Sequence, residues 1–237
     1  MRLFLAVLVG KLVRQVVKLR GGGSAYPGRI SLLIEPQLLT KTLGNFPQGI
    51  VYVSGSNGKS TTTTFIVSVL ESQGLKVFTN ASGSNMPRGI ASAIVNQASM
   101  FGQIDADIAV IEVDEGYAKA ISSELIPNWF VLTNIQIDQL NRFFEPDRVF
   151  QMLLDAAQKS TQGVIVNGTD ANLMELASRL VSIDTFQISA SAKALKVWPE
   201  GALAAPIFGK KIQSSIWPVL VTVEDEHDGV GEFAIEG

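Results

Sequence analysis

The chain has 237 residues, of which 46% are hydrophobic and 17% are charged, and its formal net charge is −3. This composition can bury a substantial core and excludes a disordered chain, and the negative charge gives no reason to expect nucleic acid as a partner. The sequence contains no cysteine, which excludes disulfides and cysteine-ligated zinc and agrees with a cytoplasmic protein.

Residues 1–20 predict a basic amphipathic helix. Their apolar run, residues 3–9, is far too short to span a bilayer. Three basic residues follow at helical spacing, Lys11, Arg14 and Lys18. Another face of the helix carries Leu8, Leu12, Val16 and Leu19. This face either packs on the body of the protein or lies on an anionic membrane surface, and we expect packing because such faces are usually buried in protein.

A change of pattern divides the chain near residue 46. Glycines at positions 21–23 break the first helix, and Pro27-Gly28 marks a turn. After Pro47, strand and helix patterns alternate. We therefore expect residues 1–46 to form an N-terminal arm of amphipathic helix and glycine-rich linker, and residues 47–237 to form one α/β domain.

The alternating segments predict the fold class. Near-continuous apolar segments are expected to be strands at residues 50–53, 76–79, 108–113, 130–133 and 164–166. Helical patterns lie between them at residues 59–73, 89–98, 117–124, 148–159 and 172–181. This order predicts a mostly parallel sheet of the P-loop type with helices on both faces. Beyond residue 189 the pattern weakens, and we expect residues 219–223 and 232–235 to form a terminal hairpin.

The most specific motif follows the first predicted strand. Here Gly55-x-x-Gly58-Lys59-Ser60 leads directly into a helix, so that backbone N–H groups can converge on one anion at the helix N-terminus. Lys59 would reach the β- and γ-phosphates of a nucleoside triphosphate, and the Ser60 hydroxyl would bind Mg²⁺. The generic pattern has a further glycine where Val53 stands, so an ordinary strand-to-helix turn is the alternative. The flanking strand and helix favour the nucleotide site.

Polar residues at the predicted strand ends support one site. The first, third, fourth and fifth strands end at Ser54, Asp114, Asn134 and Asn167. In parallel sheets, ligands bind at the carboxyl ends of the strands. A carboxylate beside a phosphate loop is the expected second ligand of Mg²⁺, and the alternative is a solvated acidic loop. Asn167 could equally be a helix N-cap.

The segment Gly55-Ser-Asn-Gly-Lys-Ser-Thr61 resembles the ATP-binding loop of the Mur ligase superfamily. Further segments narrow the resemblance to the MurT family, the Mur ligase-like subunits of lipid II isoglutaminyl synthase. These segments are residues 20–28, 79–93, 111–115 and 132–142. The resemblance covers about residues 18–180 and identifies residues 47–237 as a Mur ligase-like ATP-binding central domain.

The resemblance implies ATP and Mg²⁺ as cofactors and assigns roles to individual residues. Lys59 and Glu112 are expected to be catalytic, and Ser60 and Glu112 to bind Mg²⁺, whereas Asp114 and Glu115 point elsewhere or act through water. The residues expected to bind the nucleotide are Gly55, Ser56, Asn57, Gly58, Lys59, Ser60, Thr61, Asn134 and Asn167.

Two other positions bear on the site of the acceptor substrate and on which branch of the superfamily the chain resembles. Asn85 and Arg88 match a segment that faces the acceptor substrate. Gln139 stands where amino-acid-adding Mur ligases commonly have a histidine for a second Mg²⁺, which favours the MurT branch.

The implied reaction is ATP-dependent amidation of the stem-peptide glutamate of lipid II, a lipid-linked peptidoglycan precursor. Ammonia would come from a glutaminase subunit (GatD-like), in the cytoplasm or at the inner face of the membrane, where residues 1–20 could make peripheral contact. Two alternatives remain open. One is an amino-acid-adding ligase of the Mur or folylpolyglutamate type, and the other is a nucleotide-binding module without catalysis.

The sequence also departs from the family. The MurT family usually has a four-cysteine zinc ribbon, so the lack of cysteine implies that no zinc is bound. Mur ligases carry a third, C-terminal domain that would begin near Gly237, and we expect the chain to be a fragment or a reduced member that is incomplete as an enzyme. His227, among acidic residues, is expected to lie at a solvated hairpin tip and not in a metal site.

Overall fold

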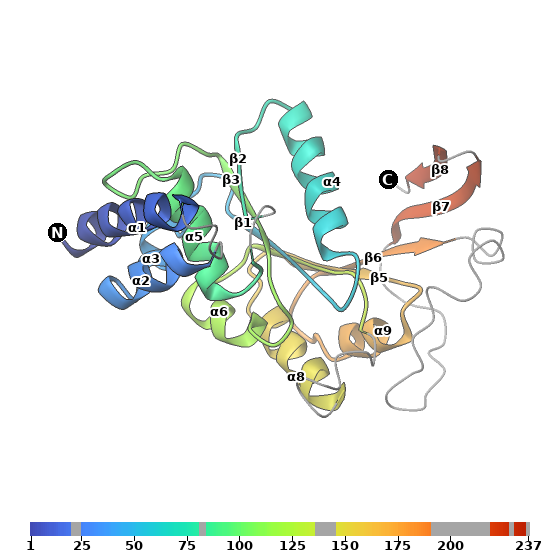
Figure 1. The fold of residues 1–237 in the computed structure, drawn as a ribbon. Helices are drawn as coiled ribbons and strands as arrows, with labels where there is room; N and C mark the ends of the chain where they lie inside the picture. The colour runs from blue at the N-terminus through green and yellow to red at the C-terminus, as the bar shows by residue number, and fades with distance from the viewer. Residues whose placement is uncertain (20–24, 81–83, 136–145, 191–218, 228–229, 236–237) are drawn as a thin grey trace.

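The computed structural model describes residues 1–19, 25–80, 84–135, 146–190, 219–227 and 230–235. Within these residues one sheet of eight strands has the order β2-β3-β1-β4-β5-β6-β7-β8 (Figure 1). All neighbouring strands are parallel except β7 and β8, which form the predicted terminal hairpin. The prediction of a mostly parallel sheet is therefore confirmed. The strands are β1 Ile50–Ser54, β2 Val77–Thr79, β3 Ile108–Glu112, β4 Trp129–Leu132, β5 Gly163–Asn167, β6 Thr185–Ala190, β7 Val219–His227 and β8 Val230–Ile235.

Helices cover both faces of the sheet, as predicted, but unequally. The helices that connect the strands are α4 Lys59–Ser72, α5 Pro87–Gln97, α6 Ala118–Glu124, α8 Pro146–Ala157 and α9 Ala171–Ser178. Among them, α4 lies on one face, while α5, α6, α8 and α9 lie on the other (Figure 1). The strand order explains this, because the connection from β1 to β2 runs toward one edge of the sheet and the later ones run toward the opposite edge. Right-handed crossovers therefore place α4 on the opposite face from the rest.

The core follows the alternation of side chains along β1. Ile50 and Tyr52 point into the larger hydrophobic cluster under α5, α6, α8 and α9. Val51 and Val53 point to a smaller cluster, which residues 66, 67 and 70 of α4 cover. Every residue of β1 is buried, as expected for a central strand of a parallel sheet. The strand that leads into the glycine motif is therefore held rigidly on both faces.

The N-terminal helix packs on the body, but through a face that the sequence analysis did not choose. Helix α1 (Arg2–Leu19) lies against α2 (Tyr26–Ile34) and α5, and it also contacts α3 (Leu38–Leu43). Its buried residues are Ala6, Val7 and Gly10. A Cβ at Gly10 would overlap the Ser31 hydroxyl, so small residues allow this close approach.

The leucine face of α1 is turned outward. Leu12, Val16 and Leu19 are 56%, 49% and 88% exposed and Leu8 is half-buried, so the prediction that this face packs on the protein was wrong for all but Leu8. The small residues on the other side fit the surface of α2 and α5 more closely than these larger side chains could. No helix in the described part of the chain is long and apolar enough to cross a membrane.

Candidate functional site

The glycine motif forms a tight turn between β1 and α4. Gly55 and Gly58 both have positive φ, at 134° and 79°, a conformation that favours glycine. A Cβ at Gly55 would also overlap the Thr133 hydroxyl and lie 2.7 Å from the Asn134 carbonyl oxygen. Gly55 is therefore required both by its backbone conformation and by the close approach of the β4 end.

Helix α4 begins at this turn without a side-chain cap. Gly58 is its N-cap residue, no side chain of the described residues accepts a hydrogen bond there, and the first turn carries no acidic residue. The N-terminus of a helix exposes N–H groups and the positive end of its dipole. An anion such as a phosphate would satisfy both.

Lys59 is held across the glycine turn. Its Nζ donates to the carbonyl oxygens of Gly55 and Ser56, the latter at 3.0 Å. It also pairs with Glu115 Oε2 at 3.3 Å, and the two side chains are only 11% and 1% exposed. The ammonium group is thus already positioned at the turn where the motif predicts phosphate.

Ser60 and Glu112 lie together, as the predicted metal site requires. The Ser60 hydroxyl donates to Glu112 Oε2 at 2.8 Å, and the Asn85 amide donates to Glu112 Oε1 at 3.2 Å. Asn80 fixes the backbone of Glu112 through two hydrogen bonds, of 2.8 and 2.9 Å. Glu112, at the end of β3, is 9% exposed. A hydroxyl and a carboxylate oxygen are the hard ligands that Mg²⁺ prefers, so these residues fit the ion.

Glu115 is a site residue whose role the sequence analysis missed. It points away from Ser60 and Glu112, as expected, but its partner, Lys59, was not predicted. Its other oxygen, Oε1, is buried and has no hydrogen-bond partner among the described residues. Burial raises the pKa of Glu115, Asp114 adds to this shift, and Lys59 opposes it. The sequence signal was the second glutamate, three residues after Glu112, but the turn between the two decides where each side chain points.

Asn134 shapes the glycine turn from the end of β4. Its carbonyl oxygen accepts from Ser56 N at 2.9 Å. Its side-chain amide accepts from Asn57 N at 2.9 Å and donates to Asn57 O at 3.0 Å. Thr133 adds a hydrogen bond from its hydroxyl to Asn57 O at 2.7 Å. Asn134 therefore holds the turn in shape.

Asn167 also joins this group, but not as a helix cap. Its Nδ2 donates to Thr133 O at 3.1 Å, and its Oδ1 accepts from Thr169. The N-cap of α9 is instead Asp170, which accepts from two N–H groups of the first turn and from Ile135 N at 3.0 Å. The alternative in which Asn167 caps the helix is therefore wrong.

Other predicted residues lie partly beyond this group. Arg88 is exposed in the first turn of α5, near Asn85 in sequence. Gln139 falls outside the described residues, and of His227 only the backbone, at the end of β7, is described. No cluster of three or more His, Asp or Glu side chains that could hold a metal occurs in the described ranges. A metal at Ser60 and Glu112 would therefore need water or phosphate oxygens as its remaining ligands.

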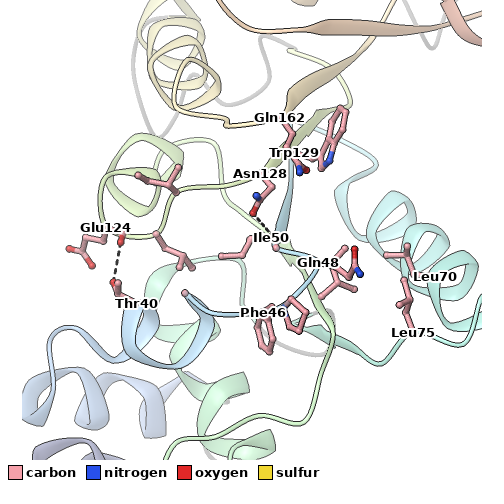
Figure 2. A pocket seen from close by; sticks show the side chains of 16 residues that line it. Thr40, Phe46, Gln48, Ile50, Leu70, Leu75, Glu124, Asn128, Trp129 and Gln162 are labelled. Carbon is pink, nitrogen blue, oxygen red and sulfur yellow. Dashed lines mark hydrogen bonds between the residues drawn. The ribbon is translucent and has the colours of Figure 1, made fainter.

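A cavity of about 620 Å³ lies near the amino ends of β1 and β4, at the opposite ends of the strands from the glycine turn (Figure 2). There Asn128 accepts from Ile50 N at 2.9 Å, and Thr40 donates to the Glu124 carbonyl oxygen at 3.0 Å. The residues described around the cavity include no Lys or Arg. The cavity is therefore unsuited to a triphosphate and is separate from the glycine turn.

Residues 53–223 match the family described as "Mur ligase middle domain". The chain is 37% identical over 165 residues to the lipid II isoglutaminyl synthase (glutamine-hydrolyzing) subunit MurT of Streptococcus pneumoniae, covering 69% of this chain and 36% of that protein. It is 32% identical over 171 residues to the same subunit of Staphylococcus aureus strain COL, covering 72% and 38%. The matched part thus spans well under half the length of these relatives.

The fold agrees with these matches. MurF ligase from Thermotoga maritima in complex with ADP superimposes with a TM-score of 0.57 at 20% identity, over 86% of this chain and 42% of that chain. At this identity the likeness shows the fold alone. The match over residues 53–223 shows the family, and the fold is consistent with it. The chain belongs to the Mur ligase middle domain family.

Proposed function

We propose that this chain is the ATP-binding part of an ATP-dependent amide ligase that amidates the stem-peptide glutamate of lipid II. The two relatives described above are named as MurT subunits of the glutamine-hydrolyzing lipid II isoglutaminyl synthase, which supports this choice within the family. Glutamine hydrolysis supplies ammonia, so the proposal includes a glutaminase subunit (GatD-like) as the partner. We place the chain in the cytoplasm, at the inner membrane face when it meets the lipid-linked acceptor.

The observation that carries the proposal is the grouping of Lys59, Ser60 and Glu112 around an uncapped helix N-terminus. ATP would place its phosphates at the glycine turn, and Lys59 would exchange the carbonyl oxygens of Gly55 and Ser56 for phosphate oxygens. Bound Mg²⁺ would supply positive charge that neutralises the transferring phosphoryl group. Ser60 and Glu112 would hold that ion.

The neighbouring residues would keep this arrangement in place. Glu115 holds the Lys59 ammonium beside the turn. Asn134 and Thr133 fix the backbone of the turn from the next strand, so that little reorganisation is needed when a phosphate binds. We place Asn167 at the nucleotide because it joins the same network through Thr133.

The acceptor would enter beside Glu112. Asn85 is bonded to Glu112, and Arg88 is exposed in the first turn of the following helix, where a carboxylate or phosphate of the acceptor could bind. The acceptor carboxylate would attack the γ-phosphorus and release ADP. Ammonia would then attack the acyl carbon of the resulting acyl phosphate and release phosphate.

Product analysis tests the proposed reaction. The chain, supplied with the C-terminal domain of a MurT relative, would be combined with a glutaminase subunit of lipid II isoglutaminyl synthase, lipid II, glutamine, ATP and Mg²⁺. The stem peptide would then be examined by mass spectrometry. We expect an amide on the glutamate, together with stable association of the two subunits in gel filtration. A stem peptide extended by an amino acid, or two subunits that stay separate, would contradict the proposal.

A further inference from the structure

Helix α1 presents an apolar stripe to solvent on the side opposite its buried face. The stripe, which we call the α1 face, consists of Phe4, Leu5, Leu12, Val16 and Leu19 of the helix and of Met1, which precedes it. Leu5, Leu12, Val16 and Leu19 follow helical spacing, and their exposed fractions run from 47% to 88%. Phe4 also packs against Phe101, which is 71% exposed, with ring centroids 5.7 Å apart.

This stripe differs from the scattered exposed apolar residues of an ordinary surface. Single exposed leucines are normal, but a contiguous apolar patch marks an interaction site. Ala6, Val7 and Gly10 already anchor the helix to the protein. Apart from the contact of Phe4 with Phe101, the larger residues of the α1 face lie outside that packing and remain available for a partner outside the chain.

The charge of α1 indicates the kind of partner. Arg2, Lys11, Arg14 and Lys18 give the helix four positive charges, and it contains no Asp or Glu. The whole chain has a net charge of −3, so the remaining residues carry −3 − 4 = −7. A basic helix on an acidic body is attracted to an anionic surface, while the body is repelled from it. The helix would therefore face that surface.

We propose that the α1 face docks on a bilayer surface that contains anionic lipid. The helix lies in the plane of the interface, with its apolar residues among the acyl chains and its basic residues at the level of the lipid phosphates. A second copy of the chain fits the α1 face less well, because two helices with four positive charges each would repel one another. A lipid-linked acceptor agrees with this proposal, but the inference depends on α1 alone.

Vesicle sedimentation of the full chain tests the proposal without nucleotide or acceptor, so its outcome is independent of the proposed ligase activity. Vesicles of phosphatidylglycerol mixed with phosphatidylcholine are compared with pure phosphatidylcholine. We expect the chain to sediment with the anionic vesicles and to be released by high salt. Lys11→Gln and Lys18→Gln should each lower the partition constant about fivefold.

Two substitutions on the α1 face separate insertion from simple charge attraction. Leu12→Glu and Val16→Glu should abolish sedimentation, because they place a carboxylate among acyl chains and anionic phosphates. The matched controls lie elsewhere. Val181→Glu changes a residue that is 91% exposed, and Lys76→Gln removes one charge from a side chain that is 62% exposed; both should bind like the wild type.

Three results would overturn the proposal. The first is a wild type that does not sediment with anionic vesicles, and the second is a Leu12→Glu variant that binds as well as Val181→Glu. The third is a dimer in analytical ultracentrifugation that Leu12→Glu dissociates, which would assign the α1 face to a second copy. Because Leu12 and Val181 are both exposed, equal unfolding temperatures of the two variants would show that loss of binding does not reflect loss of the fold.

Discussion

Two carboxylates three residues apart take different positions in the candidate site. Glu112 ends β3 and contacts Ser60, while Glu115 follows the turn and contacts Lys59. The first pair offers hard oxygen ligands to a cation, and the second holds a cationic side chain beside the glycine turn. The proposed metal ligand and the carboxylate that positions Lys59 are therefore different residues, which the sequence alone could not establish.

This separation predicts different responses to magnesium. Glu112→Gln should raise the Mg²⁺ concentration needed for ATP binding by about tenfold or more, because an amide oxygen is a weaker ligand than a carboxylate. Glu115→Gln should change the Mg²⁺ requirement less, since its partner is Lys59. Titration of ATP binding over a range of Mg²⁺ concentrations measures the Mg²⁺ requirement of both variants. If Glu115→Gln raised the requirement more than Glu112→Gln, the assignment of the two residues would be reversed.

Glu115 should also make stability depend on pH. Burial raises the pKa of its carboxyl above the ordinary value of 4.5, so the folded state retains a proton that the unfolded chain has lost. Between these two pKa values the folded state binds more protons, and the free energy of unfolding falls as pH rises. The stabilising contribution is complete below pH 4.5 and is lost as pH passes the raised pKa.

Glu115→Gln should remove this part of the pH dependence. Denaturant unfolding of the wild type and the variant, measured from pH 4.5 upward, gives the difference between their free energies of unfolding at each pH. Asp170, whose pKa burial also raises, is present in both proteins, and its contribution therefore cancels. If the free energy of unfolding changed equally with pH in the two proteins, Glu115 would release its proton at the same pH whether the chain is folded or unfolded.

At the scale of elements, hydrophobic patterns predicted the strands and helices that surround the site. The helix predicted at residues 59–73 is α4 Lys59–Ser72, and the strand predicted at 108–113 is β3 Ile108–Glu112. Strand β6 was missed because two of its side chains, Thr185 and Gln187, are polar yet only 5% and 4% exposed. Burial of such residues depends on neighbouring elements, which local sequence does not reveal.

Helix α2 was missed for a related reason. Pro27-Gly28 suggests a turn, but proline is well suited to the first turn of a helix, where its missing N–H costs nothing. Gly28 is needed because α5 passes close by, and Gly28 N donates to the Ser92 hydroxyl at 2.8 Å. The contact with α5 therefore explains Gly28, which local sequence alone indicates as part of a turn.

Gly28→Ala should destabilise the N-terminal helices. A Cβ there would overlap the Arg88 carbonyl oxygen and lie 2.5 Å from the Ser92 nitrogen, both of which are backbone atoms of α5. Overpacking of this kind costs about 1–3 kcal/mol. Denaturant unfolding measures the loss, with Arg29→Ala at the next, exposed position as the control. A variant as stable as the control would show that α2 and α5 separate easily.

For the whole molecule, the topology explains why distant segments form one site. β1, β3, β4 and β5 are parallel, so their carboxyl ends lie on the same side of the sheet. There they bring together Ser54, Glu112, Asn134 and Asn167. The sequence predicted this convergence from the polar strand ends, but with Asp114 as the end of the third strand, whereas β3 ends at Glu112. The hydrogen bonds between Asn134 and the glycine turn could not be predicted, because they depend on how the β4 end meets Gly55. The role of Gln139, outside the described residues, stays a prediction.

Calorimetric titration with Mg-ATP decides whether the glycine turn binds the phosphates of ATP through Lys59. Lys59→Ala should weaken binding at least tenfold, about 1.4 kcal/mol, because the ammonium group beside the turn is lost. Lys76→Ala, which removes an exposed lysine paired with Asp105, should bind like the wild type. Unfolding transitions would establish that both variants are folded. Unchanged affinity in a folded Lys59→Ala protein would contradict the nucleotide site.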